Sequence, residues 1–264
     1  MSLAAPRRTI TLAAVFCLVG ILVAELALSI RQQSQTSDEG IHLLAGYGYW
    51  LRRDFGVNPE HPPLGKWVAS LPLLILKPAL PIPRTPWVGF MDGSQFLQAD
   101  DADGLLFASR MAASLFTILL ALLIFEAAHQ MFGPGPAFLS LTLLIFEPNL
   151  LAHGALVTTD MALTCSMFAA VYSFYRYTRQ PTPLRLAGAG FATGMTLAAK
   201  HSGVLIIPIL FALALVEWWF WWRARRAGAE APSEKPEGLL RHAARLALAV
   251  FAVVLISGGV LWGF

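Results

Sequence analysis

The sequence is poor in charge. Only 13% of its 264 residues are Asp, Glu, Lys or Arg, whereas 56% are hydrophobic and the mean hydropathy is +0.61. A soluble domain of this length buries its core with far less apolar surface, so the composition excludes an ordinary soluble domain and indicates an integral membrane protein. Apolar runs of about twenty residues, the length that crosses a bilayer as a helix, recur along most of the chain.

Cysteine is also scarce. Cys17 and Cys165 both fall within apolar runs, where we interpret them as small core residues and assign them no redox role. The net charge of +3 and the pI near 9.1 are not accompanied by the mixture of aromatic and basic residues that nucleic-acid surfaces use, so we expect no nucleic-acid partner. No internal repeat of solenoid or transporter spacing is found.

The apolar runs predict an all-α integral membrane protein, a polytopic bundle of about seven spans. The expected spans are 9–30, 106–130, 136–153, 160–177, 185–199, 203–222 and 246–263. The fifth and sixth are short or rich in glycine, so a re-entrant pair around Lys200 is an alternative. The first run is too long for a cleavable signal peptide and is expected to remain as an anchor. An apolar run that continues to Phe264 leads us to expect further spans after it.

Basic residues next to the spans set the expected orientation. They gather at 7–8, 176–185 and 223–245, and the positive-inside rule places these segments, with the N-terminus, in the cytoplasm. The segments 31–104, 147–160 and 200–202 then share the outer side, which we expect to be the periplasmic face of a bacterial inner membrane. The tryptophans between 218 and 222 are expected to form part of an interfacial aromatic belt.

The first outer segment, 31–104, is expected to be a structured lid. Thr36 and Glu39 have the spacing of a capping box ahead of a short helix that breaks near Asn58. Pro62 and Pro63 suit the start of a second helix, which Pro72 interrupts. The apolar face of this second helix is too short to span the membrane and is typical of an interfacial helix.

A carboxylate in this segment is the candidate catalytic base. Asp38 lies where a helix N-terminus stabilises negative charge, and an ionised carboxylate can accept the proton of an attacking hydroxyl. Capping of the helix is the alternative, although Thr36 is able to take that role. For Glu39 the alternatives of substrate binding and capping stay open. Asp100, Asp101 and Asp103 are expected to cap the following span.

Two cations are candidate phosphate ligands, because a departing phosphate is stabilised by positive charge placed in advance. These are Arg110 and Lys200, with His201 beside the lysine; the alternative is that they only extend into the interface. The remaining polar residues of the outer side are expected to bind substrate, and they are Glu39, His42, Glu60, His61, Lys66 and Asp160.

A divalent metal is the one cofactor left open. Glu60, His61, His153 and His201 fall on the expected outer side. None of them has the close spacing, such as His-x-x-x-His, that metal ligands often show, so we assign no metal ligand and no other cofactor.

Several motifs of the chain together resemble family 39 glycosyltransferases. The first outer loop carries Asp38-Glu39-Gly40-Ile41-His42, Asp54-Phe55 and Asn58-Pro59-Glu60-His61-Pro62-Pro63-Leu64. Ser109-Arg110, Pro148-Asn149-Leu150-Leu151-Ala152-His153-Gly154, Val157-Thr158-Thr159-Asp160 and Ala199-Lys200-His201-Ser202 follow in the order of that superfamily. It includes protein O-mannosyltransferases and lipid A aminoarabinose transferases, and its members are longer, so this chain resembles their N-terminal part.

The resemblance implies a C-type glycosyltransferase fold. It also implies transfer of a sugar from a polyprenyl-phosphate carrier to an acceptor hydroxyl on the outer side, with Asp38 as base. The implied partners are the lipid-linked donor, a protein, lipid or glycan acceptor, and membrane lipids. We further expect inversion at the anomeric carbon, with Arg110 and Lys200 holding the departing phosphate.

Two other function classes remain alternatives. In a lipid or ion transporter, or a flippase subunit, the same outer charges would bind a moving ion or head group. Such proteins carry ionisable groups deep within their spans, whereas Glu25, Glu126, Glu147 and Glu217 fall near span ends here. A non-catalytic lipid-binding partner is the second alternative.

Overall fold

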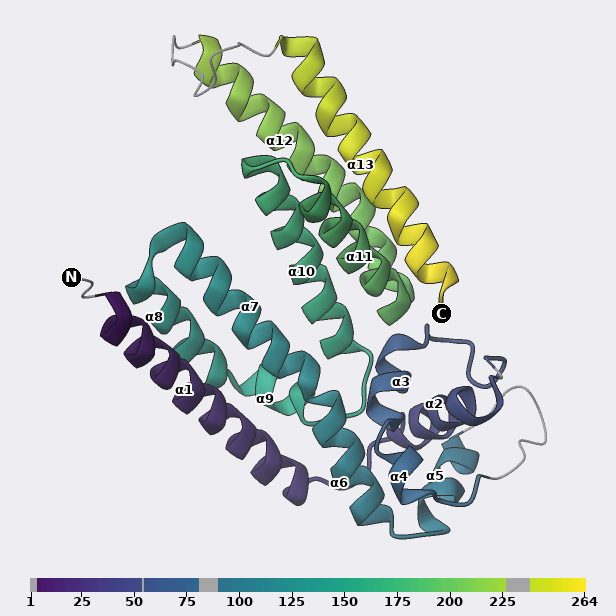
Figure 1. The fold of residues 1–264 in the computed structure, drawn as a ribbon. Helices are drawn as coiled ribbons and strands as arrows, with labels where there is room; N and C mark the ends of the chain where they lie inside the picture. The colour runs from purple at the N-terminus through teal and green to yellow at the C-terminus, as the bar shows by residue number, and fades with distance from the viewer. Residues whose placement is uncertain (1–3, 54, 81–89, 227–237) are drawn as a thin grey trace. The chain divides into compact units, whose positions relative to one another are not determined.

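The computed structural model describes residues 4–53, 55–80, 90–226 and 238–264. All secondary structure within these ranges is helical, and the chain divides into two compact units, Met1–Cys165 and Ser166–Phe264. The helices, labelled in Figure 1, are α1 (Ala4–Gln32), α2 (Glu39–Arg52), α3 (Leu64–Ser70), α4 (Leu73–Leu76), α5 (Phe90–Gln98), α6 (Ala102–Ala113), α7 (Leu115–Phe132), α8 (Pro134–Ile145), α9 (Pro148–Gly154), α10 (Asp160–Arg179), α11 (Pro183–Ala199), η1 (His201–Leu205), α12 (Ile206–Arg226) and α13 (Leu239–Trp262).

Three long apolar helices of the first unit, α1, α7 and α8, pack side by side (Figure 1). Their shared core is aliphatic and includes Leu22, Leu26, Ala121, Leu141 and Ile145, all buried. Burial of such side chains stabilises the packing by about 1.5–3 kcal/mol each in water. In a bilayer the gain is smaller, because the lipid tails are as apolar as the core.

The short helices of the first unit form a second core around α2. This helix packs against α3 and α5, and α3 packs against α6. Leu43, Tyr47, Leu73, Phe96 and Leu105 meet in the interior. The described helices of the predicted outer segment are therefore folded together. They pack against α6, the next helix in the sequence.

The second unit packs α13 closely on α11. Gly190 and Gly194 are one turn apart on α11, and a Cβ atom built on either would lie within 2.6 Å of Ile256 or Val260. Glycines at this spacing let two membrane helices approach at backbone distance. Phe174, Ile206 and Leu210 lie in a buried cluster to which α11 and α13 also contribute.

Three helix starts follow a common pattern in which proline occupies the first helical position. Gly133-Pro134, Glu147-Pro148 and Thr182-Pro183 begin α8, α9 and α11. Proline fits there because the first N–H groups of a helix have no partner within it. Glu147 and Thr182 also accept backbone N–H groups of the first turn. At Gly133 the backbone turns with φ +88°, a conformation that glycine adopts without strain.

All seven expected spans fall on helices, but fewer pass a test of length and hydropathy. Four described helical segments pass it, Thr9–Gln32, Ala102–Phe132, His201–Arg226 and Leu239–Trp262, and the pair α8 and α9, bent by 61°, makes a fifth if counted as one span. Of the others, α11 has only 17 residues and α10 is rich in hydroxyl side chains. The membrane-embedded helical fold is confirmed, and the count of seven stays a prediction.

The prediction that both cysteines are core residues holds for one of the two. Cys165 is buried, whereas Cys17 lies on an exposed face of α1. The core interpretation is therefore wrong for Cys17. Hydrophobicity alone does not separate a residue that faces other helices from one that faces lipid.

The helices of segment 31–104 begin near the expected positions, but α2 ends at Arg52, before the break expected near Asn58. Pro63 and Pro72 stand directly before α3 and α4, and Asp101 caps α6 by accepting the N–H of Gly104 at 3.1 Å. The capping box is only half formed, because α2 begins at Glu39 itself. The Glu39 carboxylate accepts the Thr36 N–H at 2.9 Å, but the Thr36 hydroxyl is buried with no hydrogen bond among the described residues.

Close contact between α2 and α3 depends on Gly46. A Cβ atom at this position would lie 2.3 Å from the carbonyl oxygen of Lys66. The position of the Cβ atom is fixed by the backbone of α2, and the carbonyl oxygen belongs to the backbone of α3. Neither atom can move without displacing a helix. Gly48, two residues later in the same helix, has nothing within 4 Å of its Cβ position.

We expect Gly46→Ala to lower the free energy of unfolding by about 1–3 kcal/mol, the usual cost of forcing extra volume into a packed interior. Gly48→Ala is the matched control and should be neutral or stabilise the helix by up to about 1 kcal/mol. Thermal unfolding of the two variants in detergent measures the difference. Equal midpoints would contradict the proposed close contact.

Candidate functional site

The centre of the first unit is a buried ion pair between Glu39 and Arg110. Arg110 Nε donates to Glu39 Oε1 at 2.7 Å and Nη2 donates to Oε2 at 2.6 Å. The two side chains are 0% and 1% exposed. Two parallel charge-assisted hydrogen bonds of this kind fix orientation as well as distance. The pair joins the start of α2 to α6, across 71 positions of sequence.

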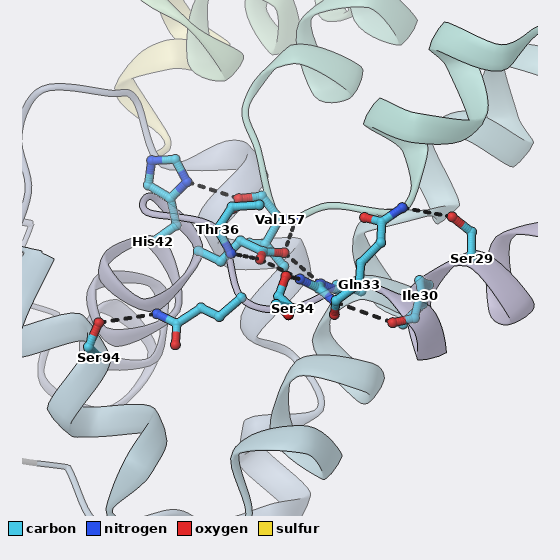
Figure 2. Close-up of polar contacts among 11 residues, drawn as sticks. Ser29, Ile30, Gln33, Ser34, Thr36, His42, Ser94 and Val157 are labelled. Atoms are coloured by element: carbon cyan, nitrogen blue, oxygen red, sulfur yellow. Dashed lines mark hydrogen bonds and ion pairs between the residues drawn. The ribbon is translucent and has the colours of Figure 1, made fainter.

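The remaining N–H groups of Arg110 bind the last turn of α1 and the chain that follows it. Nη1 donates to the carbonyl oxygens of Ile30 and Gln33, at 3.3 and 2.8 Å, and Nη2 donates to that of Ser34 at 2.8 Å. Figure 2 shows these labelled residues gathered around the hydrogen-bond network. Because a guanidinium has five N–H groups, Arg110 has none left over in this arrangement.

Glu39 is equally committed. Its carboxylate accepts the backbone N–H of Thr36 and, at 3.0 Å, that of Val157, both labelled in Figure 2. Burial opposes ionisation, but the hydrogen bonds from Arg110, Thr36 and Val157 outweigh it and hold the pKa of Glu39 below its usual 4.5. Glu39 is therefore an ionised anchor for three chain segments.

The environment of Asp38 differs from that of its neighbour Glu39. Its side chain is exposed, it stands at the N-cap position of α2, and it makes no capping hydrogen bond. The one hydrogen bond described for its carboxylate is accepted from the adjacent Ser37 hydroxyl at 3.3 Å. The carboxylate thus lies exposed at the N-terminus of α2. Asp38 occupies the N-cap position of the helix, but its side chain makes no capping hydrogen bond there.

Two histidines lie close to this helix start. His42 Nδ1 is 3.1 Å from the Val157 carbonyl oxygen, a contact visible in Figure 2. The His42 ring meets the His61 ring edge to face, with centroids 5.7 Å apart. Burial lowers the pKa of His42 despite the opposing effect of the Val157 carbonyl. Two of the predicted substrate-binding residues are therefore brought together.

Lys66 is fully buried and holds the turn that carries Glu60 and His61. Its Nζ donates to the carbonyl oxygens of Asn58 and His61 at 2.6 and 2.7 Å, and to Tyr49 Oη at 3.2 Å. The turn includes Asn58 with φ +52°, which asparagine tolerates better than most residues. Glu60 projects into solvent from this turn. Lys66 thus contacts the chain that presents Glu60 and His61.

Asp160, Lys200 and His201 complete the predicted set. Asp160 is half-buried at the first position of α10. Lys200 ends α11 in an extended conformation and is half-buried, and His201 is exposed at the start of η1. The last two belong to the second unit, so their convergence with Asp38 stays a prediction.

Sequence reasoning missed two contributors to the site. The backbone of Val157 contacts both Glu39 and His42, and Tyr49 Oη donates to the Val57 carbonyl at 2.6 Å while it accepts from Lys66. Tyr49 could have been found from the sequence, because it lies in the helix that carries the Asp38–His42 motif. The contacts of Val157 are made by its backbone, and no pattern of side chains predicts such contacts.

A cavity of about 270 Å³ lies beside the ion pair. Its wall includes Ile30, Arg31, Asp103 and Phe107, together with Arg110, and the Arg31 guanidinium lies 5.3 Å from the centre of the Phe107 ring. Within the described part of the chain, no group of three or more His, Cys, Asp and Glu side chains is arranged to hold a metal ion.

The ion pair generates a stability prediction. Glu39→Gln leaves the Arg110 charge buried without a counter-charge, and we expect a loss of about 3–5 kcal/mol in the free energy of unfolding. Glu217→Gln is the control, because it breaks the partly exposed pair that Glu217 makes with Arg179 at 2.7 Å and should cost under about 1 kcal/mol. Thermal unfolding in detergent compares them, and similar losses would refute the structural role of Glu39.

Lys66 generates a pH prediction. Burial lowers the pKa of Lys66 from its usual 10.5 to about 7, so the unfolded chain holds more protons than the folded one between those values. Stability should therefore rise with pH across that window, by up to about 1.4 kcal/mol per pH unit. Lys66→Met removes this contribution. Unfolding midpoints measured from pH 7 to 10 should rise in the native protein relative to the variant, and parallel curves would contradict the assignment.

Comparison with known proteins agrees with this architecture. Residues 102–229 match the sequence model of the family described as dolichyl-phosphate-mannose-protein mannosyltransferase. No curated protein sequence matches the chain. Among solved structures, the fold is similar to a chain of the S. cerevisiae protein O-mannosyltransferase Pmt1-Pmt2 complex bound to the sugar donor, with a TM-score of 0.60 and 18% identity.

The chain spans about a third of that yeast relative. The similarity covers 94% of the present chain and 32% of the other. The sequence motifs and the shared fold thus agree, and the C-type membrane fold predicted from the resemblance is confirmed. In sequence, residues 102–229 are similar to the dolichyl-phosphate-mannose-protein mannosyltransferase family, and the chain shares its fold with the yeast protein.

Proposed function

We propose that the protein transfers a sugar from a polyprenyl-phosphate carrier to an acceptor hydroxyl on the outer, periplasmic side of the membrane, with Asp38 as general base. The observation that carries the proposal is the contrast between two adjacent carboxylates. Glu39 is buried and fully hydrogen-bonded, whereas Asp38 is exposed beside it and makes no capping bond. The family match to mannosyltransferases supports the reaction class.

This contrast divides the work between the two residues. A general base must reach the proton that it removes, so it needs an accessible oxygen. A positioning residue must instead hold the chain still, and Glu39 does so by joining Thr36, Arg110 and Val157. In the proposal Asp38 is the catalytic residue. Glu39 acts through the backbone that carries it.

The turn from 58 to 66 positions the substrate. Lys66 holds the turn from within, so that Glu60 is exposed and His61 meets His42 at its inner side. Hydrogen-bonding groups on a fixed turn can orient sugar hydroxyls without rearrangement during the reaction. We assign sugar or acceptor binding to His42, Glu60 and His61, with Asp160 as a further polar contact.

Phosphate binding is assigned to Lys200 and His201. Arg110 was an equal candidate on sequence grounds, but its five N–H groups already have acceptors. A direct bond from Arg110 to phosphate would require one of these bonds to break. In the proposal Arg110 therefore contributes by holding Glu39, and Lys200 supplies the cation at the departing phosphate.

The proposed transfer needs no reactant besides the lipid-linked donor and the acceptor hydroxyl. Asp38 takes the proton of the acceptor hydroxyl, and the oxygen attacks the anomeric carbon from the face opposite the phosphate. The new C–O bond forms as the bond from that carbon to the phosphate oxygen breaks, so the electron pair leaves with the polyprenyl phosphate. Attack from the opposite face inverts the anomeric configuration.

The carrier tail explains why such chemistry belongs at a membrane boundary. Each methylene taken from hydrocarbon into water costs about 0.8 kcal/mol, so a polyprenyl tail stays in the bilayer while its head group reacts outside it. The apolar segments Thr9–Gln32 and Ala102–Phe132 supply the embedded part of the first unit. The donor, the acceptor and the surrounding lipids are the partners that this arrangement requires.

Asp38→Asn tests the base assignment. We expect transfer to fall by at least about 100-fold, because an amide cannot accept the proton and a positioned base contributes about 10²–10⁴ in rate. Membranes containing the complete protein are assayed with a panel of lipid-phosphate sugars, and released carrier phosphate is measured. Asp100→Asn is the control, since Asp100 is an exposed carboxylate that, among the described residues, accepts a hydrogen bond from the neighbouring Asp101 N–H at 2.9 Å. Transfer by Asp38→Asn at the control rate would overturn the assignment.

A further inference from the structure

An apolar groove runs between α12 and α13 in the second unit. It has a volume of about 230 Å³, and its wall includes Phe211, Leu215 and Trp218 from α12 with Leu246, Ala247 and Val250 from α13. The two helices lie side by side (Figure 1). Both belong to segments apolar enough to cross a membrane, so whatever fills the groove there must be apolar.

Small residues on α13 leave this groove open. Ala243 and Ala247 are one turn apart and both line it, and a methyl group fills little of the space between two helices. The opposite contact of α13 is different, because Gly190 and Gly194 of α11 draw that helix to backbone distance. On the α12 side, by contrast, Phe211 and Leu215 remain 55% and 52% exposed.

The face of α12 that lines the groove continues to an arginine. Trp218, Trp222 and Arg226 follow at intervals of four residues, which places them along one side of a helix. The rings of Trp218 and Trp222 are stacked with centroids 6.4 Å apart. The Arg226 guanidinium lies 4.1 Å from the centre of the Trp222 ring, in the geometry of a cation–π contact.

The groove therefore offers an apolar path with a cation at one end. Arg226 is exposed and is the last residue of α12, and basic residues crowd this end of the helix, with Arg223 and Arg225 in the same turn. Tryptophan and arginine in this order are typical of the membrane–water boundary. A ligand that matches both parts has a hydrocarbon chain and an anionic head.

We propose that the groove between α12 and α13 binds an anionic phospholipid, with an acyl chain against Leu215, Trp218 and Ala247 and the head-group phosphate at Arg226. The site lies at the end of α12 that the positive-inside rule places in the cytoplasm. It is separate from the proposed transfer chemistry, which belongs to the outer side. Its failure would leave the assignment of Asp38 untouched.

Brominated lipids test the proposal, because bromine on an acyl chain quenches tryptophan fluorescence on contact. The complete protein is placed in phosphatidylcholine nanodiscs with increasing mole fractions of dibrominated phosphatidylglycerol or dibrominated phosphatidylcholine. We expect half-maximal quenching at a clearly lower mole fraction of the anionic lipid. Equal mole fractions for the two lipids would overturn the proposal.

Two pairs of variants locate the site. Arg226→Gln should reduce the preference for phosphatidylglycerol about fivefold, the effect of one basic residue near an anionic head group. Arg241→Gln is the matched control, since Arg241 is exposed on α13 and lies about half a turn away from the face formed by Ala243 and Ala247. Loss of preference in both variants would indicate general charge attraction and refute the site.

Ala247→Phe fills the groove and should raise the mole fraction needed for quenching by either lipid. Ala244→Phe adds the same ring to an exposed position of α13 outside the groove and should leave the curves unchanged. If the two variants behave alike, the groove is not where the acyl chain binds.

Discussion

The buried pair of Glu39 and Arg110 joins segments that no local interaction would bring together. Arg110 binds the last turn of α1 and the chain after it through three backbone carbonyls, and it binds the start of α2 through a carboxylate. Glu39 then binds the turn at Val157. Charges without solvent are costly unless every donor and acceptor is satisfied. Here each N–H group of the guanidinium has an acceptor, so the pair can serve as the fixed point of the short helices around α2.

Asp38 depends on that fixed point. Because Glu39 is immobilised, the backbone immediately before it is immobilised too, and an exposed carboxylate is held at a defined place on α2. Lys66 has a similar role for the turn that carries Glu60 and His61. In both cases a buried, hydrogen-bonded side chain orders the chain, and a nearby residue is exposed. This separation suits a site that must be rigid and open at once.

The second unit is held together by a different kind of contact. Its close helix pair depends on Gly190 and Gly194, and its α12–α13 side has an apolar groove from which the same face of α12 continues to Arg226. Among hydrocarbon tails there is little hydrophobic gain from bringing helices together, so shape complementarity decides which faces meet. In the proposal, a lipid chain fills this groove through the same van der Waals contacts that an apolar side chain would make.

Much of the fold is determined locally and was readable from the sequence. Apolar runs of membrane length, the prolines that precede α3 and α4, and Asp101 as the cap of α6 all act through nearby residues, which is why their positions were predicted. The motif order also predicts Asp38 as the catalytic base. Tertiary structure decided what Arg110 and Glu39 do, and it decided that Cys17 faces outward. A sequence shows which residues carry charge, but only the fold shows which acceptors surround that charge and hence whether it remains available to a substrate.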